Sequence, residues 1–181
     1  MADDPDDLAE YFSRPPLERI LDHLAKAMMD VRDLPEFAYD GSWLERSTRT
    51  FPAAAGCRDA FYVAVRCVAE FFVRMPSRDY SARDFLPTWQ PRKALAARLD
   101  RVWWVASKHV VHMSRDRVPP DMTGWAPEDT SYRGLRAVGR DCWKVLAEFT
   151  DAYTAAGGEY TQNFREMRDG TRPMTRREQA Y

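Results

Sequence analysis

The chain has 181 residues and a mass of 21.0 kDa, the length of one domain. Hydrophobic residues make up 45% of it and charged residues 30%, so the composition excludes a wholly disordered chain. The net charge of −1 lacks the strong basic excess that a polyanion binder usually shows. The apolar runs are too short for a membrane span, and the acidic start of the chain differs from a signal peptide, so we expect a cytoplasmic protein.

Both ends of the chain lack an apolar stripe. Residues 1–14 are acidic and aperiodic, and we expect them to be flexible. Residues 159–181 are polar and charged, and we expect a mobile tail, with room for a short helix near Phe164–Met167. The helical domain is therefore predicted to cover residues 15–158.

The first predicted helix begins at Pro15-Pro16 and ends at Pro35, because proline is tolerated in the first turn and disfavoured later. Its apolar residues recur with the period of an α-helix and predict one buried stripe. They are Leu17, Ile20, Leu21, Leu24, Met28 and Val31.

The second predicted helix runs from Ala53 to Arg74 and stops before Pro76, after a connection over residues 35–54. Its apolar face is broad, so this helix should be the most buried. The face holds Phe61, Val65, Val68 and Phe72, widened by Ala60, Ala64, Cys67 and Phe71. In the connection before it, Trp43, Leu44 and Phe51 suggest packing onto the core.

A second connection, residues 76–91, leads to the third predicted helix, Pro91–Ser114. In the connection, Asp84 is placed to cap a short turn, and Phe85, Leu86 and Trp89 are apolar anchors. The stripe of the helix is unbroken over several turns. It consists of Leu95, Leu99, Val102, Trp103, Ala106, Val110 and Met113.

The fourth predicted helix begins at a cap, Thr130 or Ser131, and ends at Gly157-Gly158. Its inner face consists of Leu135, Val138, Cys142, Val145, Leu146, Phe149 and Tyr153. No segment alternates with the period of a strand. We therefore predict an all-α fold, an antiparallel four- to five-helix bundle with two long ordered connections and flexible termini.

The three cysteines, Cys57, Cys67 and Cys142, are odd in number and lack a C-x-x-C spacing. This usage indicates neither a disulfide framework nor a zinc ribbon. We expect buried, reduced thiols.

Two of the three histidines, His109 and His112, lie three residues apart on the third predicted helix. Such a pair binds a metal only with a further ligand, which His23 could supply if the first and third helices pack in register. The H-E-x-x-H motif is absent, and so are the P-loop, the G-x-G-x-x-G loop and the G-x-S-x-G elbow. We predict no metal, no cofactor and a structural His112.

A basic and aromatic stripe follows the third helix beside its apolar one. It contains Arg101, Trp104, Lys108 and Arg115, with Trp103 as its neighbour. Such a surface can bind a phosphate or a carboxylate, and Trp104 can stack on a base. The alternative is a solvated helix face balanced by Asp100 and Asp116.

Short motifs of this chain resemble a set of uncharacterised bacterial helical proteins. The motifs are EFFVR at 70–74, SARDFLPTW at 81–89 and ASKHVVHMSRDRV at 106–118. The residues that match are Asp84, Phe85, Trp89, Ser107, Lys108, His112, Met113, Ser114 and Arg117. This resemblance implies a fold and no activity.

The predicted bundle with a late histidine is also similar to HEPN domains, which include RNA-cleaving toxins and defence proteins. That resemblance implies a ribonuclease acting through His112 or His109 with Arg101, Lys108 or Arg117. The family signature is an arginine, four to six residues and then a histidine. No arginine stands at that spacing here, and Arg101 lies one position too far from His109.

Three functions remain open from the sequence. The first is a non-catalytic helical interaction or regulatory module that binds a protein partner or dimerises, because Trp and Arg are favoured in interfaces. The second is the HEPN-like ribonuclease, with RNA as its partner. The third is a small-ligand sensor whose pocket is lined by Trp103, His112 and Cys142.

Overall fold

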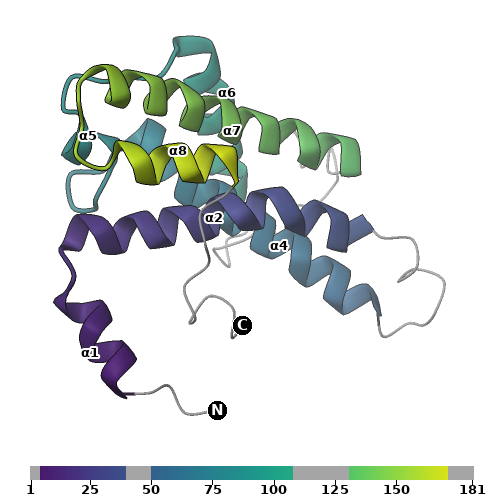
Figure 1. Cartoon of the computed structure of the whole chain (residues 1–181). Coiled ribbons are helices and arrows are strands. Elements are labelled where there is room, and N and C mark those ends of the chain that lie inside the picture. The colour runs from purple at the N-terminus through teal and green to yellow at the C-terminus, as the bar shows by residue number, and fades with distance from the viewer. Residues whose placement is uncertain (1–4, 40–49, 108–130, 171–181) are drawn as a thin grey trace.

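The computed structural model describes residues 5–39, 50–107 and 131–170, and these residues form an all-α fold (Figure 1). Their elements are α1 (Pro5–Ser13), α2 (Pro16–Tyr39), α4 (Thr50–Ala69), the π-helix η1 (Glu70–Arg74), α5 (Ala82–Phe85), α6 (Lys93–Val105), α7 (Tyr132–Ala155) and α8 (Thr161–Asp169). None of the helices in these ranges combines the length and the apolar character that crossing a bilayer requires.

The helices pack as a bundle whose main pairs are α2 with α4, α2 with α7, and α7 with α8. In Figure 1, α7 runs opposite to α2, and α8 folds back antiparallel along α7. Helix α6 packs against α4, η1 and α7. This arrangement confirms the predicted bundle.

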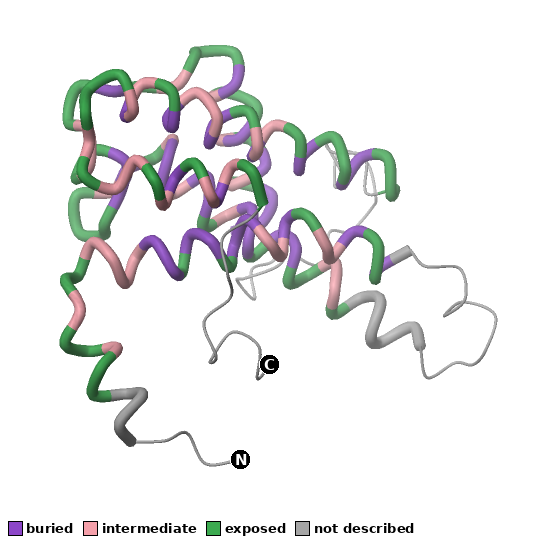
Figure 2. Tube along the Cα trace, in the orientation of Figure 1, coloured by how far each residue is buried: buried purple, intermediate pink, exposed green. Residues whose placement is uncertain are grey.

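The buried residues face the inside of the bundle, as the purple segments in Figure 2 show. The predicted inner face of α7 is confirmed in full, since all of its residues are buried. On α4, the side chains of Phe61, Val65 and Val68 are 0% exposed, and so is Phe72 on η1. The helical period of apolar residues therefore located the core, but it was wrong at Ala60 and Cys67, which the prediction placed on the apolar face of the second helix and which are exposed.

An aromatic cluster joins the connection after η1 to α7 and α8. The ring centroids of Trp89 and Phe149 are 5.0 Å apart, and those of Phe149 and Phe164 are 4.8 Å apart, both edge to face. Phe72 approaches the same Phe149 ring at 5.5 Å. Edge-to-face rings add stability beyond their buried area, and Trp89 is confirmed as an anchor.

Two of the predicted caps are present. The Ser131 hydroxyl accepts from the backbone N–H of Gly134 at 3.2 Å and begins α7. The Asp84 carboxylate accepts from the backbone N–H of Ser81 at 2.7 Å and from its hydroxyl at 3.1 Å. Ser81 and Asp84 together form a capping box that starts the short helix α5.

Pro35 does not end the first helix, because α2 continues to Tyr39 with Pro35 inside it. Proline lacks the N–H that would bond to the carbonyl of Val31. Gly139 of α7 lies over this point, and a Cβ there would stand 3.4 Å from that carbonyl oxygen. Pro35 and Ala38 are both buried, so packing of the last turn offsets the lost hydrogen bond.

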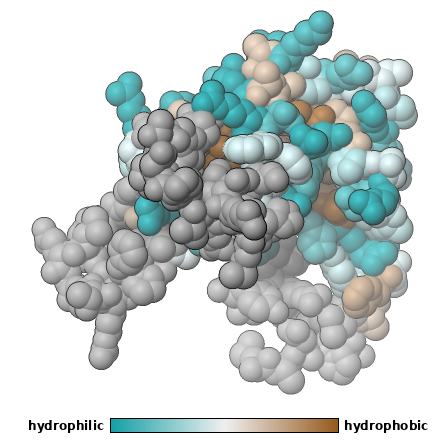
Figure 3. Space-filling model, turned by 180° about the vertical axis from the view of Figure 1, so that it is seen from behind, coloured by the Kyte–Doolittle hydropathy of each residue, from teal (hydrophilic) through white to brown (hydrophobic). Residues whose placement is uncertain are grey.

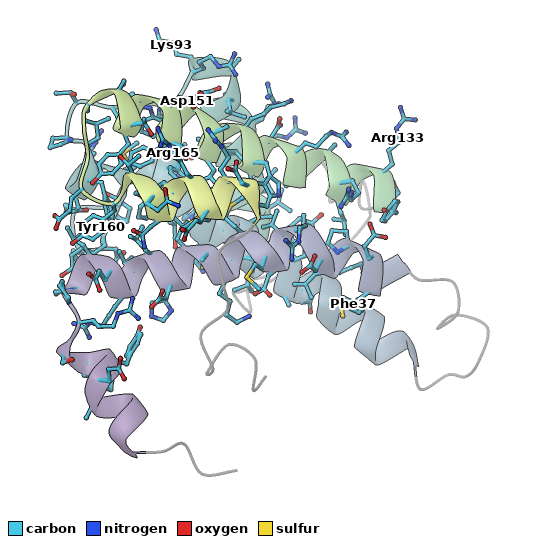
Figure 4. The ribbon with its side chains drawn as sticks, in the orientation of Figure 1. Phe37, Lys93, Arg133, Asp151, Tyr160 and Arg165 are labelled. Atoms are coloured by element: carbon cyan, nitrogen blue, oxygen red, sulfur yellow. The ribbon has the colours of Figure 1, made fainter. Side chains whose placement is uncertain are left out.

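The prediction of an undocked tail from residue 159 is wrong for Thr161–Asp169, which forms α8. Phe164 is 0% exposed and Met167 is 3% exposed, both in the core. Arg168 also donates to Asp151 of α7, labelled in Figure 4, at 3.2 Å. The predicted short helix near Phe164–Met167 is confirmed, and residues 171–181 lie outside the described range.

The N-terminal segment also departs from the prediction of an aperiodic stretch, since Pro5–Ser13 forms helix α1. Its junction with α2 is polar. Tyr11 and His23 are hydrogen-bonded at 3.0 Å between the phenol oxygen and Nε2, and Arg14 Nη1 donates to Asp22 Oδ2 at 2.7 Å. These contacts link α1 to α2 without a shared apolar stripe.

The boundaries of the other helices agree with the prediction where they are described. The second helix spans α4 and η1, and the third is described from Lys93 to Val105. The predicted anchors Trp43, Leu44 and Phe51 fall outside the described side chains, as do Val110 and Met113.

Candidate functional site

The predicted site residues are described only in part. Arg101, Trp103 and Trp104 lie on α6. The other predicted site residues, Lys108, His109, His112, Arg115 and Arg117, lie outside the described residues. The candidate site is therefore built from α6 and the elements that pack beside it.

The two neighbouring tryptophans of α6 have different surroundings, since consecutive residues on an α-helix differ in direction by about 100°. Trp103 is half-buried against α4 and η1. Trp104 is 47% exposed, and Arg101 is exposed as well. Trp103 thus packs against the core, as its place in the predicted apolar stripe indicates, and Trp104 beside it is largely exposed.

Trp103 is held by charged side chains of α4 and η1. Its indole Nε1 donates to Glu70 Oε1 at 2.9 Å. The Arg74 guanidinium carbon lies 3.8 Å from the centroid of the indole ring, a close cation–π contact. Arg74 Nη1 also donates to Asp100 Oδ1 of α6 at 2.6 Å. This network, which fixes both the indole and Arg74, was not apparent in the sequence.

The second arginine of the network is Arg66 on α4. Its Nε donates to Glu70 Oε1 at 3.0 Å, and its guanidinium carbon lies 5.9 Å from the ring centroid of Trp103. Glu70 therefore accepts from both α4 and α6. Arg66 and Glu70 are four residues apart on one helix, so their contact could be predicted from the sequence. The contact of Glu70 with Trp103 depends on how η1 and α6 pack.

The π-helical winding of η1 places these side chains. Glu70–Arg74 forms the π-turn, and Met75 closes it in the left-handed region at φ 45° with its N–H bonded to the Glu70 carbonyl at 2.8 Å. Phe71 and Phe72 are buried while Arg74 stays at the surface. Single π-turns inside α-helices are frequent at functional sites.

We call this surface the α4–α6 face, and it consists of Arg66, Glu70, Arg74, Asp100, Trp103 and Trp104. It carries two cations and two anions, so its formal charge is balanced. This balance differs from the predicted basic stripe, of which Arg101 lies exposed next to this face and Lys108 and Arg115 lie outside the described residues. Tryptophan and arginine side chains at a surface are the residue types that dominate protein–protein contacts.

The described cysteines do not supply a reactive thiolate next to the α4–α6 face. Cys67 is exposed and Cys57 half-buried, which corrects the prediction that all three thiols are buried. Desolvation and the charge of Glu70 raise the pKa of Cys67, so its reactive thiolate is disfavoured. Only Cys142 is fully buried, and burial raises its pKa strongly.

The described residues hold no group of three His, Cys, Asp or Glu side chains placed to bind a metal. His23 is exposed and bonded to Tyr11. Our prediction that His109 and His112 bind no metal concerns residues outside the described range, and it stays a prediction.

The predicted pocket around Trp103, His112 and Cys142 includes His112, which lies outside the described residues, so the pocket stays a prediction. Of its two described residues, Trp103 contacts Glu70 and Arg74, and Cys142 is 0% exposed in the core. A cavity of about 230 Å³ lies elsewhere, between α2, α7 and α8, and its tryptophan is Trp143. The sequence did not reveal it, because Trp143 and Met29 flank the apolar stripes.

Comparisons of this chain with protein-family models, with curated proteins and with solved structures found no match.

Proposed function

We propose that this protein is a non-catalytic helical interaction module that self-associates through the α4–α6 face. The observation that carries the proposal is Trp104, a large aromatic side chain 47% exposed beside the fixed Trp103–Arg74 stack. As the sequence predicts, we place the module in the cytoplasm.

The energetic reason is the apolar area that Trp104 exposes to water. Burying apolar surface in a contact is favourable by about 25 cal/mol per Å². Trp103 and Arg74 add a surface whose conformation is already fixed, since each is held by hydrogen bonds within the subunit. A contact formed by ordered side chains loses less conformational entropy on binding.

Balanced charge favours a second copy of the chain as the partner. In a twofold interface the same patch meets itself, so it must be self-complementary. Arg74 and Asp100 provide both signs of charge at the surface, with side chains 41% and 50% exposed. The Arg74–Asp100 pair of one copy can then lie beside the same pair of the other copy with opposite charges adjacent, around a centre formed by the two Trp104 rings.

The test is the molar mass of the full chain by sedimentation equilibrium, over a range of concentrations. The wild type should form a dimer, and Trp104→Glu should be monomeric at concentrations where the wild type is dimeric. The matched control is Phe37→Glu, because Phe37, labelled in Figure 4, is 56% exposed on α2, a helix that contributes no residue to the α4–α6 face. A monomeric wild type, or equal weakening by both variants, would overturn the proposal.

Among the described residues, strongly apolar ones do not form one continuous patch on the rear face of the molecule. Apolar residues appear there as separate brown patches among hydrophilic residues (Figure 3). Single exposed apolar side chains are common on protein surfaces, so the control variant is needed to distinguish a specific contact from nonspecific hydrophobic association.

A further inference from the structure

The cavity between α2, α7 and α8 has the features of a small-molecule site and is separate from the α4–α6 face. Its volume is about 230 Å³. It is lined by Ala25, Met28, Met29, Arg32, Trp143, Met167 and Gly170. Apart from the guanidinium of Arg32 and the backbone, this lining is apolar or aromatic, as ligand pockets usually are.

The lining combines flexible methionine side chains with the flat indole ring of Trp143. Met28 and Met167 are almost fully buried, while Met29 and Trp143 are half-buried. Methionine side chains adjust to irregular shapes and make favourable sulfur–aromatic contacts. The half-buried indole of Trp143 offers a surface on which a flat ring can stack. The pocket therefore favours an aromatic body over a branched aliphatic one.

Arg32 is the one charged side chain in the lining, and it is oriented by its neighbour. Its Nε donates to Asp33 Oδ1 at 2.7 Å and its Nη2 to Asp33 Oδ2 at 2.9 Å. Nη1 lies beside Gly170, 3.3 Å from where a Cβ on that glycine would stand. Gly170 is at φ +69°, where other residues are strained, so the chain leaves room for the guanidinium here. The two bonds to Asp33 use Nε and Nη2 and leave Nη1 as the guanidinium nitrogen that lies at the rim of the cavity.

The volume sets the size of the ligand. A dry apolar cavity of about 150 Å³ holds one benzene ring. The cavity here is larger and admits a substituted or bicyclic ring, but it is too small for a nucleotide.

We propose that this cavity binds a small aromatic carboxylate. The ring lies among Met28, Met167 and the Trp143 indole, and the carboxylate accepts a hydrogen bond from Arg32 Nη1. Asp33 balances the formal charge of Arg32, so the preference for an anion comes from a direct hydrogen bond and not from net charge. Neither bond to Asp33 uses Nη1, and charge-assisted hydrogen bonds from arginine to a carboxylate are among the stronger ones in proteins.

The test uses two probes of the same shape, 1-naphthoate and the neutral 1-naphthalenemethanol. Both are titrated into the full-length protein by isothermal calorimetry. We expect saturable 1:1 binding of naphthoate, and weaker binding of the alcohol. Arg32→Gln should weaken naphthoate about tenfold and leave the alcohol unchanged, since a hydrogen bond to a charged group is worth on the order of this factor. The matched control is Arg78→Gln, an exposed arginine in the connection after η1.

A second variant tests the cavity itself. Ala25→Leu fills part of the volume and should abolish binding of both probes while the thermal melting transition stays cooperative. The proposal is overturned if naphthoate fails to saturate, if Arg32→Gln weakens both probes alike, or if Arg78→Gln has the same effect as Arg32→Gln. Should Ala25→Leu fail to fold, the comparison of the two arginine variants decides the outcome by itself.

Discussion

Leu99 shows how one side chain holds α6 to the rest of the bundle. It is 0% exposed and belongs to the core shared by α2, α4 and α7. Its neighbours on the same face, Leu95 and Val102, are also buried, so the surroundings have little freedom to close a void.

Leu99→Ala should therefore lower the free energy of unfolding by about 2 to 5 kcal/mol, the usual range for a buried leucine. Chemical denaturation monitored by circular dichroism measures this change, and because alanine has a higher helix propensity than leucine, the loss reports packing and not helix propensity. A loss below about 1 kcal/mol would show that α6 buries a different face.

Asp141 illustrates a charged residue whose titration is tied to folding. Burial by itself would raise its pKa, but hydrogen bonds and charges from Arg98 and Lys144 outweigh this effect and lower the pKa below its ordinary value. Arg98 donates to both carboxylate oxygens, at 2.6 and 3.0 Å. A pKa that is lower in the folded state means that the ionised carboxylate stabilises the fold above its unfolded pKa.

Arg98→Gln should therefore reduce stability by about 0.2 to 1 kcal/mol at pH 7, a modest effect because the arginine is half-exposed. The difference from the wild type should disappear as the pH falls from about 5 through the lowered pKa of Asp141, where the carboxylate is protonated in both proteins. Urea unfolding at a series of pH values measures it. A difference that stays constant down to pH 2 would mean that the ion pair contributes nothing.

Helix α8 is short, but it places two side chains, Phe164 and Met167, in the core of the bundle. Phe164 packs against Phe85, Phe149 and Tyr153, with ring centroids 5.4, 4.8 and 5.3 Å apart respectively. The helix thus covers the aromatic cluster that also holds Trp89. Removing α8 would expose rings of α5 and α7 to water.

Truncation after Gly158 should lower the melting temperature by roughly 10 °C or more, since Phe164 alone is worth about 3 to 5 kcal/mol. This outcome reverses what the aperiodic sequence of residues 159–181 suggested. Differential scanning calorimetry of chains ending at Gly158 and at Gly170 separates α8 from the residues after it. Equal melting temperatures for the two truncated chains would contradict the docking of α8.

For the molecule as a whole, the remaining question is whether it cleaves RNA, as the resemblance to HEPN domains implies. The residues named for that activity are mostly outside the described ranges. The described Arg101 is exposed on α6, next to a face of balanced charge.

Under the proposed function, incubation of the purified protein with total RNA should give no cleavage by the wild type or by His112→Ala. If His112 is structural, its substitution should instead cost about 1 to 3 kcal/mol of stability, because a hydrogen-bond partner is left unsatisfied. Gel electrophoresis of the RNA and thermal melting of the two proteins measure both effects. Cleavage that is lost in His112→Ala at unchanged stability would establish the nuclease instead.

Local patterns were enough to predict the all-α fold, the inner face of α7, a capping role for Asp84, and a cap for α7 at Thr130 or Ser131. Each of these depends on residues a few positions apart, where helix period and capping chemistry act. The exposed Trp104 was also predictable, since it lies off the apolar stripe.

The features that local patterns missed depend on contacts between distant segments. Helix α8 has only two apolar anchors, too few for a stripe, and it is buried because α7 offers it an aromatic surface. Pro35 stays helical because Gly139, far along the chain, lets α7 pack over it. The Trp103–Glu70–Arg74 network and the Arg32 cavity likewise join residues from separate helices. Periodicity reports which face of a helix is apolar, whereas the partner of that face is selected by the packing of the whole chain.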